Sequence, residues 1–271
     1  MTSLVLTVLL LPLTVISPAS INTSNGGTKT ELYTSEKIER ANENIVTSNT
    51  AGSHLTYGDI MVDMIEDGGV LRNAVTCTAS SCKWPKNKKN KVKIPYEITS
   101  DFSKKEANFI KKILKGFKKS TCIRFIKKKS KHRDYLSFIS ADGCWSYLGR
   151  TGNRQQISLK SQGCLFTDIV QHEVLHALGF HHEHVRSDRD DHVEINFDNI
   201  QPGVERNFEL SPTNNLGTPY DFQSVMHYSP YAFSVNGQRT ITAKNNSITN
   251  FGNAVEMSVN DYARVKRLYE C

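Results

Sequence analysis

The chain has 271 residues, which is enough for one or two domains with a sizeable core. Residues 1–72 carry four Lys/Arg and eight Asp/Glu, a net charge of −4, whereas the remainder carries 30 against 19, a net charge of +11. A basic surface is either simply solvated or meets nucleic acid, anionic lipid or an acidic protein. Beyond the first twenty residues no segment is long and apolar enough to cross a bilayer, which excludes a multispanning membrane protein.

An apolar run opens the chain, MTSLVLTVLLLPLTVISPAS, and ends in small residues near Ala19. No Lys or Arg precedes it, so its identification as a secretory signal depends on hydrophobicity and on the small-residue end. A membrane anchor is the alternative, but Pro12 and Pro18 interrupt the run and the uninterrupted part is shorter than a span. We therefore predict a cleaved signal peptide at residues 1–19, a secreted protein and no membrane anchor. Secretion argues against nucleic acid as a partner.

Residues 20–72 are polar, acidic and poor in aromatic side chains, with a short helical pattern near residues 35–46. This composition predicts a segment that does not build a core by itself. From Cys77 onward the pattern changes to short strands that alternate with amphipathic helices. Strands are expected at residues 92–98, 122–126, 135–140 and 155–159.

A well-marked amphipathic helix is predicted between the first two of these strands. Ser103 is a candidate N-cap, and Glu106, three residues later, completes a capping box. Lysines occupy the face opposite the apolar positions, so much of this lysine run is explained as the exposed side of a helix. The apolar positions are Phe109, Ile110, Ile113, Leu114 and Phe117. A final helix is expected over residues 258–269, with Tyr262, Val265 and Leu268 packed inward.

The chain has six cysteines, an even number that behind a signal peptide predicts three disulfides. Metal binding is the alternative, but no pair shows the CxxC spacing of a metal site. Six cysteines allow fifteen pairings, so the count alone does not give the connectivity. They are Cys77, Cys82, Cys122, Cys144, Cys164 and Cys271.

The segment HEVLHALGFHHEH, residues 172–184, holds five of the nine histidines. Residues 165–180 show apolar recurrence at helical spacing, so His172 and His176, four residues apart, leave the same face and can bind one ion. Glu173 lies at the edge of that face, within reach of a metal-bound water. This HExxH pattern is that of zinc peptidases, although by itself it also occurs by chance.

Gly179 makes the zinc interpretation more specific. In a continuous helix His182 would face away from the metal, but glycine can adopt the left-handed conformation that ends a helix and reverses the chain. His182 would then supply a third nitrogen, and three protein ligands with an open position predict a catalytic zinc site. Five of the other histidines are interpreted as surface residues or as supports of the ligands. These are His54, His132, His181, His184 and His192.

The run at residues 172–184, followed by VRSDRD, resembles the signature of the astacin family of metzincin zinc endopeptidases. Downstream, SVMHY at residues 224–228 resembles the Met-turn of that family. The resemblance extends over essentially all of residues 73–271. It implies an α+β fold of two subdomains with a deep active-site cleft. A twisted sheet with two long helices would form the first, and a mostly irregular C-terminal subdomain would carry the Met-turn.

The resemblance also implies residue roles. One zinc ion (Zn2+) would be bound by the three histidines, with Glu173 as general base. Met226 would form an apolar floor under the metal, and Tyr228 would ligate zinc at rest and swing away to stabilise the oxyanion. The disulfides carried over by position are Cys144–Cys164, Cys122–Cys271 and, from the fish hatching-enzyme (choriolysin-like) branch, Cys77–Cys82.

Maturation is implied by the same resemblance. The stretch RNAVTCTASSCKWPK resembles the hatching-enzyme branch, in which an activating protease would cut after Arg72 and leave Asn73 as the mature N-terminus, buried near Glu183. TYGDI at residues 56–60 resembles the family's Phe-x-Gly-Asp pattern, with Thr56 in place of phenylalanine. Asp59 is therefore the candidate carboxylate that occupies the metal's open position in the precursor. The division expected is signal peptide 1–19, propeptide 20–72 and catalytic domain 73–271.

Together these features predict a secreted, monomeric zinc endopeptidase made as a zymogen and acting on protein substrates, with secretory granules as a possible route. Resemblance to hatching enzymes suggests egg-envelope glycoproteins as the substrate. A general secreted tissue or digestive protease is the nearest alternative. A catalytically silent, zinc-stabilised binding protein is the alternative from another class.

Overall fold

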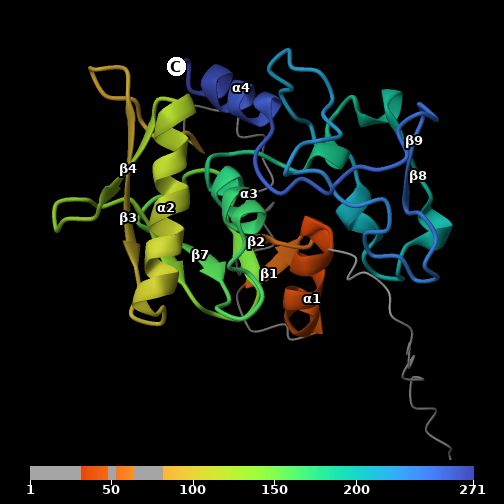
Figure 1. Cartoon of the computed structure of the whole chain (residues 1–271), viewed down its shortest axis with the longest axis horizontal. Coiled ribbons are helices and arrows are strands. Elements are labelled where there is room, and N and C mark those ends of the chain that lie inside the picture. The colour runs from red at the N-terminus through yellow and green to blue at the C-terminus, as the bar shows by residue number, and fades with distance from the viewer. Residues whose placement is uncertain (1–31, 48–52, 64–81) are drawn as a thin grey trace, which may run out of the picture. The chain divides into compact units, whose positions relative to one another are not determined.

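A seven-stranded mixed β-sheet forms the framework of the N-terminal half (Figure 1). The structure is a computed structural model that describes residues 32–47, 53–63 and 82–271, all within one folded unit, Leu32–Cys271. The strands follow the order β1-β2-β6-β7-β5-β3-β4 across the sheet. Their bounds are Ser53–Thr56 (β1), Ile60–Asp63 (β2), Val92–Ile98 (β3), Ile123–Lys127 (β4), Tyr135–Ile139 (β5), Cys144–Ser146 (β6) and Arg154–Leu159 (β7).

The sheet combines a parallel part with an extension that comes from the predicted propeptide. Strands β4, β3, β5 and β7 are parallel, and β6 is antiparallel to β7. On the far side of β6, β2 pairs in parallel through Ile60 opposite Ser146, and β1 pairs with β2 in the antiparallel sense. The edge of β6 is therefore covered by the chain's own N-terminal segment.

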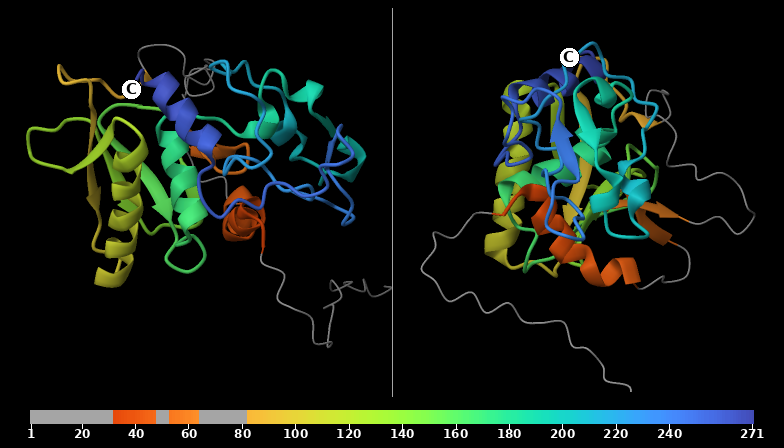
Figure 2. Two further views of the ribbon diagram at one scale, coloured as in Figure 1. Left: turned by 45° about the horizontal axis from the view of Figure 1, so that its top comes forward. Right: turned by 90° about the vertical axis from the view of Figure 1, so that its right-hand side faces the viewer.

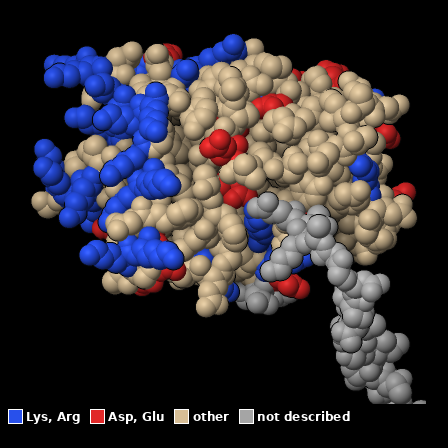
Figure 3. All heavy atoms as spheres, viewed as in Figure 1, with Lys and Arg blue, Asp and Glu red and all other residues tan. Residues whose placement is uncertain are grey.

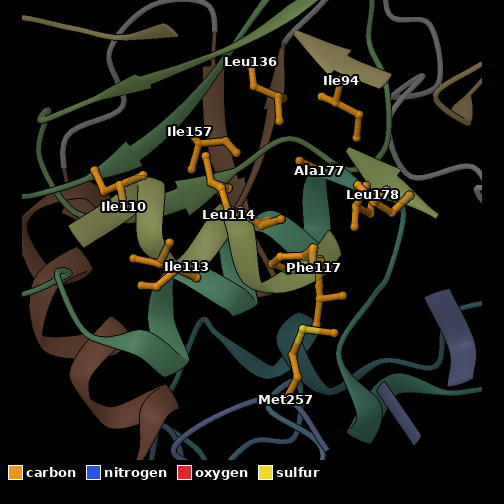
Figure 4. Close-up of a cluster of buried hydrophobic side chains, with 14 of the residues drawn as sticks. Ile94, Ile110, Ile113, Leu114, Phe117, Leu136, Ile157, Ala177, Leu178 and Met257 are labelled. Atoms are coloured by element: carbon orange, nitrogen blue, oxygen red, sulfur yellow. The ribbon is translucent and has the colours of Figure 1, made fainter. Parts of the chain in front are cut away.

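Two helices pack together on one face of the sheet and enclose the main core (Figure 4). They are α2, Lys104–Ser120, and α3, Thr167–Ala177. The predicted capping box is present, because the Ser103 hydroxyl accepts the Glu106 N–H and the Glu106 carboxylate accepts the Ser103 N–H. Apolar side chains of α2 meet those of the strands and of α3 in one cluster, as the helical spacing predicted. Among them are Ile94, Ile110, Leu114, Phe117, Leu136, Ile157 and Leu178.

The C-terminal half is mostly irregular, as expected. It contains the two-stranded sheet of β8 (Val193–Ile195) and β9 (Ile241–Ala243), together with short 3-10 helices. A separate apolar cluster supports it, built around Phe208, Phe233 and Phe251. The last helix, α4 (Val259–Leu268), returns to the first half and places Val265 and Leu268 in the main core. The two-subdomain α+β fold that the motifs implied is therefore confirmed.

Two disulfides link segments of the described chain. Cys122–Cys271 joins the chain's last residue to the start of β4, and Cys144–Cys164 joins β6 to the loop before α3. Both pairs are those expected from the resemblance. The third expected pair includes Cys77, which lies outside the described residues, as do the predicted signal peptide, Arg72 and Asn73.

The helix α1, Thr34–Thr47, is the predicted helix near residues 35–46, and it lies against both halves of the unit (Figure 1, Figure 2). Ile38 joins the main core, while the Ser35 hydroxyl accepts the Ser229 N–H of the C-terminal half. A segment that builds no core by itself is thus ordered by packing on the rest of the chain. Within the described residues, no helix is both long and apolar enough to cross a bilayer.

Candidate metal centre

The helix α3 and the turn after it bring three histidines together. His172 and His176 lie one helical turn apart, and their Nε2 atoms are separated by 3.0 Å. Gly179 follows the helix with φ +105°, a conformation that residues with a side chain rarely adopt, while its N–H still donates to the His176 carbonyl at 2.8 Å. The chain reverses at this point and returns His182, whose Nε2 lies 3.1 Å from that of His172.

Asp59 completes the cluster from the turn between β1 and β2. Its carboxylate oxygens lie 3.0 Å from Nε2 of His172, 3.3 Å from that of His176 and 3.2 Å from that of His182. The ligand atoms of the four side chains all lie within 4.8 Å of one another, and all four residues are buried. Burial alone would raise the pKa of Asp59, but the surrounding imidazoles outweigh it and hold that pKa well below its ordinary value.

The donor atoms of this cluster fit a zinc ion. Nδ1 of His172 lies 2.8 Å from the Val225 carbonyl and Nδ1 of His176 lies 2.7 Å from the Phe180 carbonyl. Because a carbonyl only accepts, each Nδ1 carries the hydrogen and each Nε2 turns its lone pair toward the centre. Oδ1 of Asp59 has no hydrogen-bond donor among the described residues. Neutral imidazole nitrogens together with a carboxylate are the donor set that zinc prefers.

The turn that carries Asp59 requires a glycine. Tyr57 has φ +50° and Gly58 has φ +82°, so both lie in the left-handed region. A Cβ at Gly58 would stand 2.8 Å from the Tyr228 hydroxyl oxygen, closer than real contacts allow. Three consecutive carbonyls of the turn accept hydrogen bonds from separate parts of the chain. The donors are the Tyr228 hydroxyl for Tyr57, the Asn42 amide for Gly58 at 2.9 Å and the Ser146 N–H for Asp59 at 3.1 Å.

Glu173 follows the first histidine and is fully buried. Neither of its carboxylate oxygens has a hydrogen-bond partner within the described part of the chain. Burial, together with the nearby charge of Asp59, raises its pKa well above the ordinary value. A buried carboxyl with both oxygens unpartnered beside a metal site can accept and return a proton.

The Met-turn residues contact the third histidine and the residues that follow it. Met226 is buried, and its carbonyl accepts the Glu183 N–H at 2.9 Å, which ties the Met-turn to the residue after the third histidine. The ring of Tyr228 lies 4.6 Å from that of His182 and stacks on His184 at 3.9 Å. With its hydroxyl on the Tyr57 carbonyl, Tyr228 is held by the predicted propeptide.

Glu183 is fully engaged in this structure. Arg264 donates to both of its oxygens, Arg186 donates to one at 3.2 Å and the Asp221 N–H to the same oxygen at 2.7 Å. Burial raises its pKa to about 7 against the opposing effect of the two arginines. A cavity of about 60 Å³ adjoins Glu183 and the two arginines. The expected partner, Asn73, lies outside the described residues, so this pairing stays a prediction.

Several functional contacts were not predicted. Asn42 and Lys37, both on α1, contact the rest of the unit: Lys37 pairs with Asp168 at the start of α3 at 2.9 Å. Neither residue belongs to a motif, and two of their partners, Asp168 of Lys37 and Cys144 of Asn42, are more than a hundred positions away. His227 was not singled out either. It is buried, and its Nε2 lies 2.8 Å from the Tyr220 hydroxyl.

The remaining histidines stand outside the cluster. His184 is buried beneath Tyr228, so it supports the site rather than facing solvent. His181 packs edge-on against Tyr57, and His192 stacks on Tyr220. His54 and His132 are half-buried. None of these five joins the group of candidate ligands within the described residues.

Comparisons with known proteins agree with this geometry. The family model of the astacin peptidases matches residues 79–270. The low choriolytic enzyme of Oryzias latipes is 39% identical over 249 residues, which is 91% of this chain and 89% of that protein. The high choriolytic enzyme 1 of the same fish is 41% identical over 228 residues, 84% of this chain and 82% of that protein.

A solved structure agrees as well. High choriolytic enzyme 1, described as a hatching enzyme zinc-protease from medaka, superposes with a TM-score of 0.70 at 44% identity, over 73% of this chain and all of that chain. The range matched by the family model includes the three histidines, Glu173 and Met226. The chain belongs to the astacin family of metalloendopeptidases, and its histidine cluster is suited to zinc.

Proposed function

We propose that this protein is a secreted, zinc-dependent protein endopeptidase made as a zymogen, with Glu173 as its general base. One observation carries the proposal: three histidine nitrogens converge on the carboxylate of Asp59, with an unpartnered glutamate beside them. The catalytically silent alternative is disfavoured because the chain keeps each candidate ligand and the glutamate.

His172, His176 and His182 would hold the metal. Zinc bound there lowers the pKa of a water molecule and polarises a carbonyl. Glu173, whose carboxylate oxygens have no other partner among the described residues, accepts the proton of the attacking water and passes it to the leaving amine. Tyr228, once released from the Tyr57 carbonyl, donates its hydroxyl hydrogen to the oxyanion of the substrate.

In the precursor, Asp59 takes the position that water needs. The hydrogen bonds to the three carbonyls of its turn support this role, because they fix the carboxylate over the histidines. Cleavage after Arg72 would give a mature chain that begins at Asn73, near Glu183. Release of the propeptide would then uncover the β6 edge and free Tyr228.

The biological role proposed is digestion of an egg envelope. It is supported by similarity to relatives named choriolytic enzymes, one of them described as a hatching enzyme. Messenger RNA confined to hatching-gland cells before hatching would support this role. Broad adult expression would instead favour a general secreted tissue or digestive protease.

The decisive test of the chemistry compares Glu173→Gln with Glu194→Gln, an exposed glutamate on β8. Both variants are activated in parallel with the wild type, and zinc content and casein hydrolysis are measured. Glu173→Gln is expected to keep its zinc and lose nearly all turnover, while Glu194→Gln keeps both. Wild-type protein that binds zinc but cleaves nothing would support the silent binding protein instead. Turnover of Glu173→Gln near the wild-type rate would remove the base assignment.

A further inference from the structure

The N-terminal half carries a face on which nearly every charged side chain is cationic (Figure 3). Residues 83–133 contain 19 Lys/Arg and 3 Asp/Glu, which leaves 15 against 24 in the rest of the chain. Seven of these lysines lie on α2, and all seven are exposed. We call the exposed lysines of α2 together with residues 127–131 the basic face.

Part of this charge pattern destabilises the helix that carries it, because only Lys118 and Lys119 lie in the last turn, where the helix dipole favours cations. Lys111, Lys115 and Lys119 repeat at i,i+4, a like-charge spacing that destabilises a helix. Lys104 and Lys105 occupy the first turn, where the helix dipole disfavours cations. No lysine of α2 forms an ion pair with a carboxylate of the described residues. A helix needed only for solubility would interleave both signs, so the pattern points to an external anionic partner.

A groove gives the basic face a defined centre. It is open, has a volume of about 480 Å³, and lies between α2 and the loop that follows β4. Lys111 lines it from α2, and residues 127–129, all lysine, line it from the end of β4 and the start of the loop. Half-buried apolar side chains, Tyr96 and Ile98 among them, also line it. Cations from two separate segments thus converge on a partly apolar groove.

The one carboxylate in the groove lining is already compensated. Glu97 pairs with Lys128 at 3.2 Å and with Arg154 at 3.8 Å, and it accepts the Ser137 hydroxyl at 3.1 Å. The charges of Lys111, Lys127 and Lys129 therefore remain available to a ligand. Carboxylates spaced along an extended chain would meet these cations while the apolar residues between them contact the lining.

The groove lies at the sheet edge opposite the metal centre. Strand β4 forms that edge, and four inter-strand steps separate it from β6, which at ~4.8 Å each amounts to roughly 19 Å. None of the residues that line the groove belongs to the metal cluster. A long substrate can therefore occupy both at once, and the second contact raises its effective concentration at the first.

We propose that the basic face is an exosite that binds an acidic, extended stretch of a polypeptide substrate; this inference rests on the proposed endopeptidase function. A polypeptide is preferred over a sulfated polysaccharide because the groove is partly apolar and because the enzyme cleaves protein. The exosite increases the frequency with which a long substrate reaches the metal centre. It does not alter the bond-breaking step itself.

The test begins with binding by the full-length precursor, which needs no activity. The probe is a fluorescein-labelled peptide in which glutamate alternates with valine, compared with its glutamine counterpart and with heparin. The variant Lys111→Glu/Lys127→Glu reverses two charges in the groove. Its matched control, Lys244→Glu/Lys266→Glu, reverses two exposed lysines outside the basic face and gives the same net charge.

The groove variant should weaken binding of the acidic peptide about tenfold or more at low ionic strength, with the difference shrinking as salt screens it. The control variant should bind like the wild type. In activated enzyme, the groove variant should lose kcat/KM on a substrate with an acidic extension and keep it on the same substrate with a glutamine extension.

Equal losses in both variants would overturn the proposal, because net charge alone would then explain the binding. Binding of heparin without preference for the acidic peptide over its glutamine counterpart would overturn it in favour of a sulfated glycan. An activated enzyme without turnover would count against the proposed function alone, since the binding arm does not depend on catalysis.

Discussion

The hydrogen bonds of Asn42 make a quantitative prediction about latency. Its amide donates to the carbonyls of Gly58 and Cys144, at 2.9 and 2.8 Å, and its side-chain oxygen accepts the Cys144 N–H at 2.8 Å. Asn42 is buried, so Asn42→Ala leaves these backbone groups without partners inside the docked segment. Three hydrogen bonds contribute about 0.5–1.5 kcal/mol each, and unpaired buried groups add a penalty. The substitution should therefore weaken the free energy of docking by about 2–4 kcal/mol. That corresponds to roughly 30- to 1,000-fold weaker binding.

The assay measures inhibition of the mature enzyme by a synthetic peptide that covers residues 32–63. Its inhibition constant is compared with those of peptides carrying Asn42→Ala or Glu43→Ala, the latter an exposed neighbour on α1. The Glu43→Ala peptide should inhibit like the unmodified one. If the inhibition constant of the Asn42→Ala peptide lies within about threefold of the unmodified value, the difference in binding free energy is less than about 0.7 kcal/mol. That result would refute the assignment that Asn42 holds the turn of Asp59 in place.

Further predictions concern the metal centre, the docked segment and the stability of the fold. The first uses a chain in which Arg72→Gln prevents activation. In that chain, Asp59→Ala should give an uncleaved precursor that hydrolyses a small fluorogenic peptide, whereas Asp101→Ala, at an exposed aspartate, should give an inactive precursor. If both precursors are inactive, Asp59 is not the inhibitory ligand. Gly179→Ala should lower the free energy of unfolding by about 1–2 kcal/mol and reduce zinc content, because φ is +105°. Gly116→Ala, inside α2 with open space around its Cβ position, should instead raise that free energy by about 0.5–1 kcal/mol, as urea titration would report. Burial raises the pKa of Glu39 to about 8 from 4.5, so the contribution of Glu39 to docking should be largest below pH 4.5 and fall as the pH rises toward 8. A peptide with Glu39→Gln should bind more tightly than the unmodified peptide at pH 8 and equally at pH 4.5. A ratio of the two inhibition constants that is the same at both pH values would contradict this. Replacing both Cys122 and Cys271 by serine opens a loop with a sequence separation of 149 and should cost about 5 kcal/mol in urea unfolding, and a loss under about 1 kcal/mol would contradict the loop-closure argument.

Local signals in the sequence predicted the parts of the fold that depend on neighbouring residues. The capping box of Ser103 and Glu106 marked the start of α2, and the four-residue spacing of His172 and His176 put both on one face of α3. Gly179 predicted a reversal, and its backbone shows one. Each of these features is determined within one or two helical turns, which is why a sequence pattern can reveal it.

Features that depend on distant partners were not predicted. Strands β1, β2 and β6 have only three or four residues, and β2 pairs with β6 through Ile60 and Ser146 alone. Predicted strand 122–126 is observed as Ile123–Lys127, one residue later at each end. The two arginines on Glu183 include Arg264, 81 positions away, and no spacing in the sequence indicates that pair.

The contacts of α1 bear on how activity would appear after cleavage. A cut after Arg72 breaks the chain beyond β2, so it breaks none of the hydrogen bonds that hold Asp59. Further hydrogen bonds join α1 to both halves of the unit, through Asn42 to Cys144 and through Ser35 to Ser229. A cleaved precursor would therefore stay inhibited until the segment dissociates or is itself degraded. On the proposed mechanism, the strength of the α1 contacts, rather than the cut alone, sets the rate at which the zinc site opens to substrate.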